Sequence, residues 1–318
     1  THLLRYGIDV ELTATKRVGF DKYTYPKGEK PAIVFDMVNG GCWDKPTEAV
    51  VRVVNDSTLS GYRFSKGWAD NQKIFFRAEF SRTFSDVEFI VDGKSQESIK
   101  EGKGERMFAR VNFAENNGKP VMMKVALSPV SEEGALQNMK AELEGWDFEK
   151  VKADAKTAWN KELGKVRIGD GANEADRTIF YTALYHSMFA PSEFCDVNGD
   201  YYGADNEMHK GEGFMNYTTF SLWDTYRAAQ PLMTVLHPEK MSDIINTMIT
   251  IYRQQGKLPV WHLMGCETNC MVGNPGIPVV ADAILKDIKG FDYELAYESL
   301  KASAMLPERG MEHRIKYG

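Results

Sequence analysis

Residues 121–165 read VMMKVALSPVSEEGALQNMKAELEGWDFEKVKADAKTAWNKELGK and contain the change that decides the fold. Up to Leu127 the stretch is short and apolar, as strands are. From about Ser131 it becomes dense in Glu, Lys, Ala and Leu. Apolar residues then recur at helical spacing on one stripe, namely Leu143, Trp146, Val151, Ala155, Ala158, Trp159 and Leu163. This pattern predicts a long helical connector, with interruptions, between a strand block and a helical block.

The chain before this point consists of short segments rich in β-branched and aromatic residues. Turn-type sequences separate them, for example at residues 39–41, 92–93 and 116–118. The expected strands are Val10–Val18, Ala49–Val54, Ile74–Phe80, Val87–Val91, Met107–Phe113 and Val121–Leu127. Several short strands at this spacing predict a sandwich of antiparallel sheets over residues 1–130.

The chain after this point alternates helical segments with loops rich in Gly, Asn and aromatic residues. The expected helices are Ala175–Met188, Trp223–Leu236, Glu239–Gln255, Ile277–Ile288 and Tyr293–Met305. Pro238 and Gly256 are start and stop signals for the third of these helices. We therefore expect residues 131–170 to form a helical linker and residues 171–318 a helical domain, whose loops gather at one end and carry the chemistry.

Composition excludes several classes of function. The 318 residues include 39 basic and 45 acidic side chains, a net charge of −6, without a polybasic tract, so nucleic acid is not an expected partner. No apolar run reaches the roughly 20 residues of a membrane-spanning helix, so no membrane partner is expected and the chain should be soluble. The chain begins at Thr1, and we expect it to be part of a longer protein.

Because Cys42, Cys195, Cys266 and Cys270 do not form a zinc or disulfide pattern, we expect free thiols.

Two loops combine aromatic, carboxylate and amide side chains. The loop 259–276 holds Trp261, His262, Glu267 and Asn269 among glycines. A sugar needs this mixture, because an aromatic plane contacts the C–H face of the ring while polar groups bind its hydroxyls. The alternative is a loop that packs its own aromatic side chain under the next helix.

The second loop, residues 218–227, places Trp223 and Asp224 side by side at a helix start, with Arg227 one turn later. An Asp in the first turn also stabilises the helix dipole, so Asp224 fits a cap as well as a ligand contact. Asp196–Asp200 resembles a calcium loop, but Tyr201 stands where such a loop needs glycine. We therefore expect a tight turn at residues 196–200 and no metal ligands within this chain.

Taken together, these segments resemble the glycoside hydrolase family 92 α-mannosidases. The resemblance extends along almost the whole chain. The stretches that carry it are Glu11–Arg17, Tyr62–Trp68, Trp159–Asn160 with Leu163, Phe180–Tyr185, Ser221–Arg227, Gly265–Gly273 and Ile277–Ala283.

The resemblance implies a fold and an activity. The fold is multidomain, an N-terminal antiparallel β-sandwich (incomplete at its N-terminus) followed by a helical linker and the first part of an (α/α)6 barrel. The activity is the calcium-dependent, exo-acting removal of α-linked mannose with inversion, from mannan, N-glycans or other mannose-terminated oligosaccharides. The resemblance also implies a secreted, periplasmic or cell-surface protein of a bacterium.

The resemblance also assigns roles to residues. Trp223 and Asp224 match positions that line the pocket for the terminal mannose, Phe64 matches an aromatic residue contributed by the sandwich, and Glu267 matches a pocket-lining position. The family's motifs for the general acid, the general base and most calcium ligands are absent from the sequence. No catalytic residue is therefore assigned within this chain, and the acid and base are expected downstream. Two alternatives stay open: a non-catalytic carbohydrate-binding fragment, and another (α/α)6 sugar hydrolase or phosphorylase.

Overall fold

The structure is a computed structural model that describes residues 1–41, 43–96, 99–211, 213–308 and 311–318. The chain divides into two compact units, Thr1–Asn160 and Lys161–Gly318. Each unit is built around its own buried apolar cluster. The two boundaries expected from the sequence, at residues 130 and 170, stay predictions.

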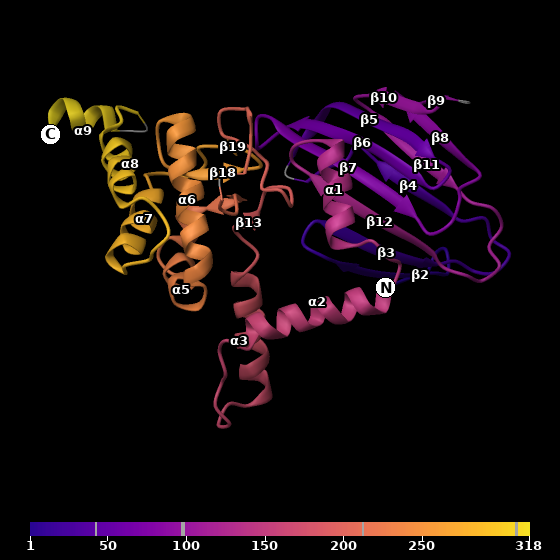
Figure 1. Ribbon diagram of the computed structural model, residues 1–318, viewed down its shortest axis with the longest axis horizontal. Helices are drawn as coiled ribbons and strands as arrows, with labels where there is room; N and C mark the ends of the chain where they lie inside the picture. The colour runs from indigo at the N-terminus through magenta and orange to yellow at the C-terminus, as the bar shows by residue number, and fades with distance from the viewer. Residues whose placement is uncertain (42, 97–98, 212, 309–310) are drawn as a thin grey trace. The chain divides into compact units, whose positions relative to one another are not determined.

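The first unit is formed by two antiparallel sheets (Figure 1). The larger sheet has the strand order β1 (His2–Leu3), β2 (Ile8–Ala14), β3 (Val18–Thr24), β12 (Val121–Ser128), β7 (Gln72–Phe80), β6 (Thr58–Lys66), β5 (Lys45–Asn55) and β10 (Glu101–Gly104). The smaller sheet has the order β4 (Ala32–Asp36), β11 (Met107–Asn112), β8 (Asp86–Val91) and β9 (Lys94–Gln96). The predicted antiparallel β-domain is therefore confirmed.

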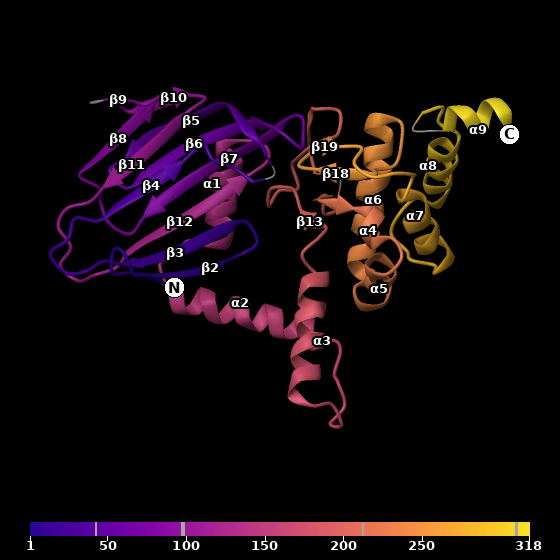
Figure 2. The ribbon, with the colours of Figure 1, turned by 180° about the vertical axis from the view of Figure 1, so that it is seen from behind.

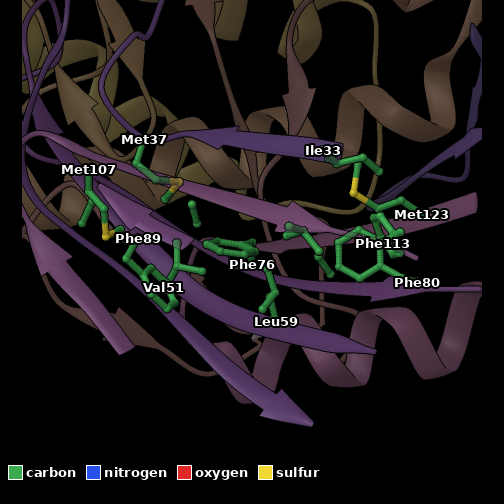
Figure 3. Packing of buried hydrophobic residues seen from close by; sticks show 14 of the residues in the cluster. Ile33, Met37, Val51, Leu59, Phe76, Phe80, Phe89, Met107, Phe113 and Met123 are labelled. Carbon is green, nitrogen blue, oxygen red and sulfur yellow. The ribbon is translucent and has the colours of Figure 1, made fainter. Parts of the chain in front are cut away.

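Side chains from the two sheets share one core (Figure 3). Leu59 and Phe76 come from the larger sheet, Phe89 and Val111 from the smaller one, and all four are buried. Such packing between inner faces is what defines a sandwich. One strand prediction was wrong, because residues 10–18 form two strands joined by a turn in which the Thr15 amide donates to the Val18 carbonyl at 2.9 Å.

A helix covers the outer face of the larger sheet. Helix α1 (Glu132–Glu142) lies against β12 and β7 (Figure 1), and its residues Ala135 and Met139 pack on Phe20 of β3. The helix begins at Ser131, whose hydroxyl accepts a hydrogen bond from the Gly134 amide at 2.9 Å. The change from strand to helix predicted near residue 131 is confirmed.

Helix α2 (Phe148–Leu163) follows after a break at residues 143–147, as the predicted interruption required. The apolar stripe predicted along this connector is buried only in part. Leu143 and Val151 are buried, whereas Ala158 is exposed and Trp159 is 39% exposed. The division between the two compact units falls inside α2.

The second unit is mainly helical. Its helices include α3 (Glu174–Ser187), α5 (Ala229–Leu236), α6 (Pro238–Gln255), α7 (Gly276–Leu285), α8 (Tyr293–Met305) and α9 (Met311–Tyr317). Short strands β13 (Ser192–Glu193), β14 (Tyr201–Tyr202), β15 (Met208–His209) and β16 (Tyr217–Thr218) lie between α3 and α5. Helix α6 is the centre of the core, with Met241, Ile244, Ile245 and Met248 buried.

The limits of α6 follow the sequence signals. Pro238 is in its first turn, and Gly256 ends it with a left-handed φ of 82°. The predicted helix over residues 223–236 was wrong as one element, because a break at residues 226–228 divides it. Pro231 explains the break: inside a continuous helix its ring would clash with the carbonyl of Arg227, whereas a helix that starts at Ala229 places it in the first turn.

Two further findings concern the cysteine residues and the apolar character of the helices. Cys195, Cys266 and Cys270 are free thiols, as predicted, and Cys42 lies outside the described residues. Within the described part of the chain, no helix combines the length and the apolar character needed to cross a membrane.

Candidate functional site

A small sheet joins the two loops that the sequence singled out. Its strands are β17 (Phe220–Ser221), β18 (Trp261–Leu263) and β19 (Cys266–Glu267), in that order. Ser221 lies opposite Trp261, and His262 lies opposite Glu267. The loops 218–227 and 259–276 are separated in sequence by α5 and α6, and this sheet brings them together.

Trp223 and Asp224 lie on a short helix, α4 (Leu222–Thr225), which is labelled in Figure 2. This helix begins directly after β17 ends. Leu222 is buried in the core of the unit, whereas Trp223 is 40% exposed and Asp224 is exposed. The Ser221 hydroxyl donates a hydrogen bond to Oδ2 of Asp224 at 2.5 Å. The short helix therefore presents an indole and a carboxylate to solvent, and the carboxylate has acceptor positions left for other donors.

The pairing of Asp224 with Arg227 that helical spacing allows is replaced by another contact. The Arg227 guanidinium donates to the hydroxyl of Tyr226 and lies 5.1 Å from the centre of that ring. Sequence reasoning missed Ser221 as the hydrogen-bond donor that orients Asp224. The signal for it was a hydroxyl residue three positions before an Asp at a helix start.

Glu267 organises the second loop. Its Oε2 accepts a hydrogen bond from the Val260 amide at 2.8 Å, and its Oε1 accepts from the Trp261 amide at 2.9 Å and the Asn269 amide at 2.8 Å. The Thr268 hydroxyl adds a bond to the Trp261 carbonyl at 2.8 Å. The carboxylate thus ties together both ends of the turn that carries it.

The aromatic side chains of this loop face inward. Trp261 is only 8% exposed and His262 only 2%, so neither presents a ring to solvent. For these two residues the structure supports the alternative interpretation, a loop that packs its own aromatic groups.

The buried His262 has an unusual environment. Its Nδ1 lies 3.5 Å from the hydroxyl of Thr218, and within the described residues its Nε2 has no hydrogen-bond partner. Burial lowers the pKa of His262 to about 3, because desolvation disfavours the charged imidazolium. The imidazole is therefore neutral near pH 7 and does not supply a proton there.

Backbone strain is concentrated in the same segments. Thr219, Met264, Asn269 and Met271 have positive φ values of 63°, 51°, 51° and 72°. Such conformations are rare for residues other than glycine, especially for β-branched threonine, and persist only where neighbouring contacts hold them. One such contact is the Met264 amide donating to the Thr218 hydroxyl at 2.7 Å.

Phe64 belongs to the first unit, on β6. Its ring stacks on Tyr62 with centres 4.4 Å apart and meets the ring of Phe75 edge-on at 5.5 Å. The Lys73 ammonium lies 5.8 Å from the ring centre. Phe64 is partly buried in this aromatic row, and its predicted place in the same pocket as Trp223 and Asp224 stays a prediction.

A second pair of aromatic residues in the first unit was not predicted as such. Trp43 is 82% exposed, and its ring centre lies 5.9 Å from that of Trp68. Close by, the Arg63 guanidinium donates to the Asp44 carboxylate at 2.6 Å and to the Met37 carbonyl at 3.0 Å. The sequence signals for loops here were the turn-type residues 39–41 before Trp43 and Gly67 directly before Trp68.

The segment Asp196–Asp200 is a tight turn, as predicted. The Gly199 amide donates to the Asp196 carbonyl at 2.8 Å, and the ammonium of Lys210 donates to the Asp200 carboxylate at 2.7 Å. Among the described residues, no group of three or more His, Cys, Asp or Glu is arranged to hold a metal ion. The described side chains therefore do not fit the calcium ion that the resemblance implies.

A hollow of about 620 Å³ lies along α3. Its lining includes Arg177, Tyr181, Tyr185 and His186. The Arg177 guanidinium is already bound to backbone carbonyls, including that of Gly169 at 2.8 Å, and the Tyr181 hydroxyl donates to the Val166 carbonyl at 3.0 Å. Because these polar groups stabilise the preceding loop, the hollow is a weaker candidate than the three-stranded sheet.

Comparison with known proteins places both units in one family. Residues 1–128 match the glycosyl hydrolase family 92 N-terminal domain, and residues 134–318 match the glycosyl hydrolase family 92 catalytic domain. A curated relative, an uncharacterized secreted glycosidase of Arthroderma benhamiae, is 25% identical over 98% of this chain and 39% of its own length.

Comparison with solved structures leads to the same family. A family GH92 α-mannosidase from Bacteroides thetaiotaomicron is 38% identical with a TM-score of 0.91, covering 96% of this chain and 42% of its own. A family GH92 inverting mannosidase from the same species is 27% identical with a TM-score of 0.86, covering 98% of this chain and 43% of its own. The chain thus spans well under half the length of these relatives.

Proposed function

Because the chain belongs to glycosyl hydrolase family 92, we propose that the full-length protein is an α-mannosidase. It removes terminal α-linked mannose from mannose-terminated oligosaccharides such as mannan or N-glycans. The observation that carries this proposal is the 38% identity, over 96% of the chain, to a family member that is an α-mannosidase, a protein also solved in complex with mannoimidazole.

The exposed residues of α4 are the proposed sugar contacts. Asp224 accepts hydrogen bonds from mannose hydroxyls, since one of its oxygens is bound only by Ser221 and carboxylates are strong acceptors. Trp223 covers the apolar face of the ring. Phe64, on the first unit, is a further proposed sugar contact, and the loop of Glu267 is proposed to line the sugar pocket.

The proposed mechanism proceeds with inversion, as the name of the inverting relative suggests. A general acid protonates the glycosidic oxygen while a general base takes a proton from water. The water oxygen then forms a bond to the anomeric carbon as the bond to the leaving oxygen breaks, and β-mannose is released. Two carboxyl groups about 6.5–9.5 Å apart do this work in inverting enzymes.

We assign these two carboxyl groups to the part of the full-length protein outside the 318 residues. Asp224 serves as a ligand of the sugar, and Glu267 already accepts three amide hydrogen bonds. We place the ligands of the implied calcium outside the same span, because the described residues provide no cluster for it.

Turnover of α-mannosides by the full-length protein tests the function. We expect mannose release without added phosphate, with β-mannose as the first anomer seen by NMR. Calorimetric binding of mannose-ended oligosaccharides without turnover would instead show a carbohydrate-binding protein, and release that depends on phosphate would show a phosphorylase.

The role of Asp224 is tested by Asp224→Ala in the full-length protein. Loss of hydrogen bonds to a charged acceptor should lower kcat/KM about 10- to 100-fold. The melting temperature should hardly change, because the side chain is exposed. Asp170→Ala, at another exposed aspartate of the same unit, is the matched control. Kinetics like those of the control would remove Asp224 from the site.

We also propose that the protein acts outside the cytoplasm, as a secreted, periplasmic or cell-surface enzyme of a bacterium. The name of the curated relative, a secreted glycosidase, supports export. Fractionation of the native host tests this, and recovery of the protein only from the cytoplasm would contradict it.

A further inference from the structure

We propose that Glu267 is a positioning residue, which holds Asp224 in place through β18 and Ser221. In this role Glu267 does not touch the sugar. The inference rests on the proposed function, because it specifies how the sugar-binding carboxylate is oriented.

The hydrogen bonds of Glu267 are the first step of the argument. A carboxylate has about four acceptor positions, and three of those on Glu267 are used by the amides of Val260, Trp261 and Asn269. Bonds from amides to a charged carboxylate are among the stronger ones in proteins. Glu267 therefore fixes the backbone before and after the turn, and β18 begins at one of the bonded residues.

The second step leads from β18 to Asp224. Trp261, whose amide is bound to Glu267, lies opposite Ser221 in the small sheet. The Ser221 hydroxyl in turn binds Asp224 Oδ2 at 2.5 Å. Because β17 has only two residues, its position depends on β18 beside it. One continuous path of hydrogen bonds and strand pairing thus joins Glu267 to Asp224.

The third step concerns the backbone that this path must restrain. Asn269, whose amide Glu267 binds, has a φ of 51°, and Thr219, immediately before β17, has a φ of 63°. Both conformations are disfavoured for these residue types and need fixed contacts to persist. The Glu267 carboxylate supplies such contacts on the β18 side.

The experiment is Glu267→Gln in the full-length protein. Glutamine keeps the size of the side chain but has one oxygen, so its amide nitrogen must face a backbone N–H. We expect the Kd for mannoimidazole and the KM each to rise about tenfold, and the melting temperature to fall by only a few degrees. Glu298→Gln, at an exposed glutamate of α8, is the matched control.

A double-mutant cycle separates positioning from direct contact. If Glu267 acts through Asp224, Glu267→Gln should change Kd less than about twofold in an Asp224→Ala background. Ser221→Ala, which removes only the middle of the path, should weaken binding several-fold and show the same coupling. If Glu267→Gln fails to fold, Ser221→Ala and its combination with Asp224→Ala still test the path.

Three results would overturn the inference. The first is an unchanged Kd for mannoimidazole in Glu267→Gln. The second is an equal loss of affinity from Glu267→Gln in the wild-type and Asp224→Ala backgrounds. The third is a Kd that Ser221→Ala does not change. Failure of the proposed function has a different signature, since a wild-type protein that neither binds mannoimidazole nor cleaves α-mannosides would refute both proposals at once.

Discussion

His262 is a buried titratable residue beside the candidate site, and it makes the stability of the second unit depend on pH. Burial lowers its pKa to about 3, from an ordinary value near 6.5 in the unfolded chain. Between these two values the unfolded state binds a proton that the folded state does not. The neutral imidazole therefore makes its full contribution to the free energy of unfolding above pH 6.5. This contribution is lost as the pH falls toward 3.

We predict that the titration of His262 alone makes the free energy of unfolding about 1 kcal/mol lower at pH 5.5 than at pH 7. The measurement is urea unfolding of the wild type and of His262→Asn at both pH values. The variant should show a smaller pH difference by that amount, while His313→Asn, at an exposed histidine, should keep the full difference. Equal pH differences in wild type and His262→Asn would show that the imidazole is not held neutral.

At the scale of elements, Gly61 of β6 permits a close approach of strands. An added Cβ there would lie 1.9 Å from the carbonyl oxygen of Val50 on β5 and 3.1 Å from Cε1 of Phe76 on β7. The backbone of Val50 cannot move away without breaking the sheet.

We therefore predict that Gly61→Ala lowers the free energy of unfolding by about 3 kcal/mol, the upper end for forced overpacking. Gly145→Ala is the matched control, because nothing lies within 4 Å of the added methyl group, and it should be neutral or slightly stabilising. Circular dichroism during urea unfolding measures both. A Gly61→Ala variant as stable as the control would contradict the close packing of β5, β6 and β7.

The elements that could be predicted are those with strong local signals. The predicted helix over residues 293–305 coincides with α8, which has Asp292 as its cap. The helix over residues 223–236 failed because its apolar pattern continues through Pro231, where the backbone cannot. The strand over residues 10–18 failed because the turn at Thr15 is fixed by tertiary contacts. These include hydrogen bonds from Thr15 and Arg17 to Glu142, which is far away in sequence.

The candidate site, too, was predictable only in part. The residue types of the two loops indicated a sugar site, but β17, β18 and β19 have only two or three residues each and leave no periodic pattern. The pairing of Ser221 with Trp261 was therefore not predictable from spacing. Nor were the three amide bonds of Glu267, since side chain–backbone bonds depend on the final path of the loop.

At the scale of the whole molecule, each compact unit has its own apolar core. The core of the first unit lies between its two sheets (Figure 3), and that of the second surrounds α6. Units with separate cores commonly unfold as separate cooperative transitions. We therefore expect two transitions in a calorimetric scan of the 318-residue chain.

Ile245→Ala and Gly61→Ala should identify these transitions. Ile245 is fully buried in α6, so its truncation should cost about 2–5 kcal/mol and lower one melting temperature by about 5–15 °C. Gly61→Ala should lower only the other transition, because Gly61 lies in the first unit. If each substitution shifts both transitions equally, or if one transition is seen throughout, the two cores unfold together. The free energy that links them would then have to come from contacts that neither core contains.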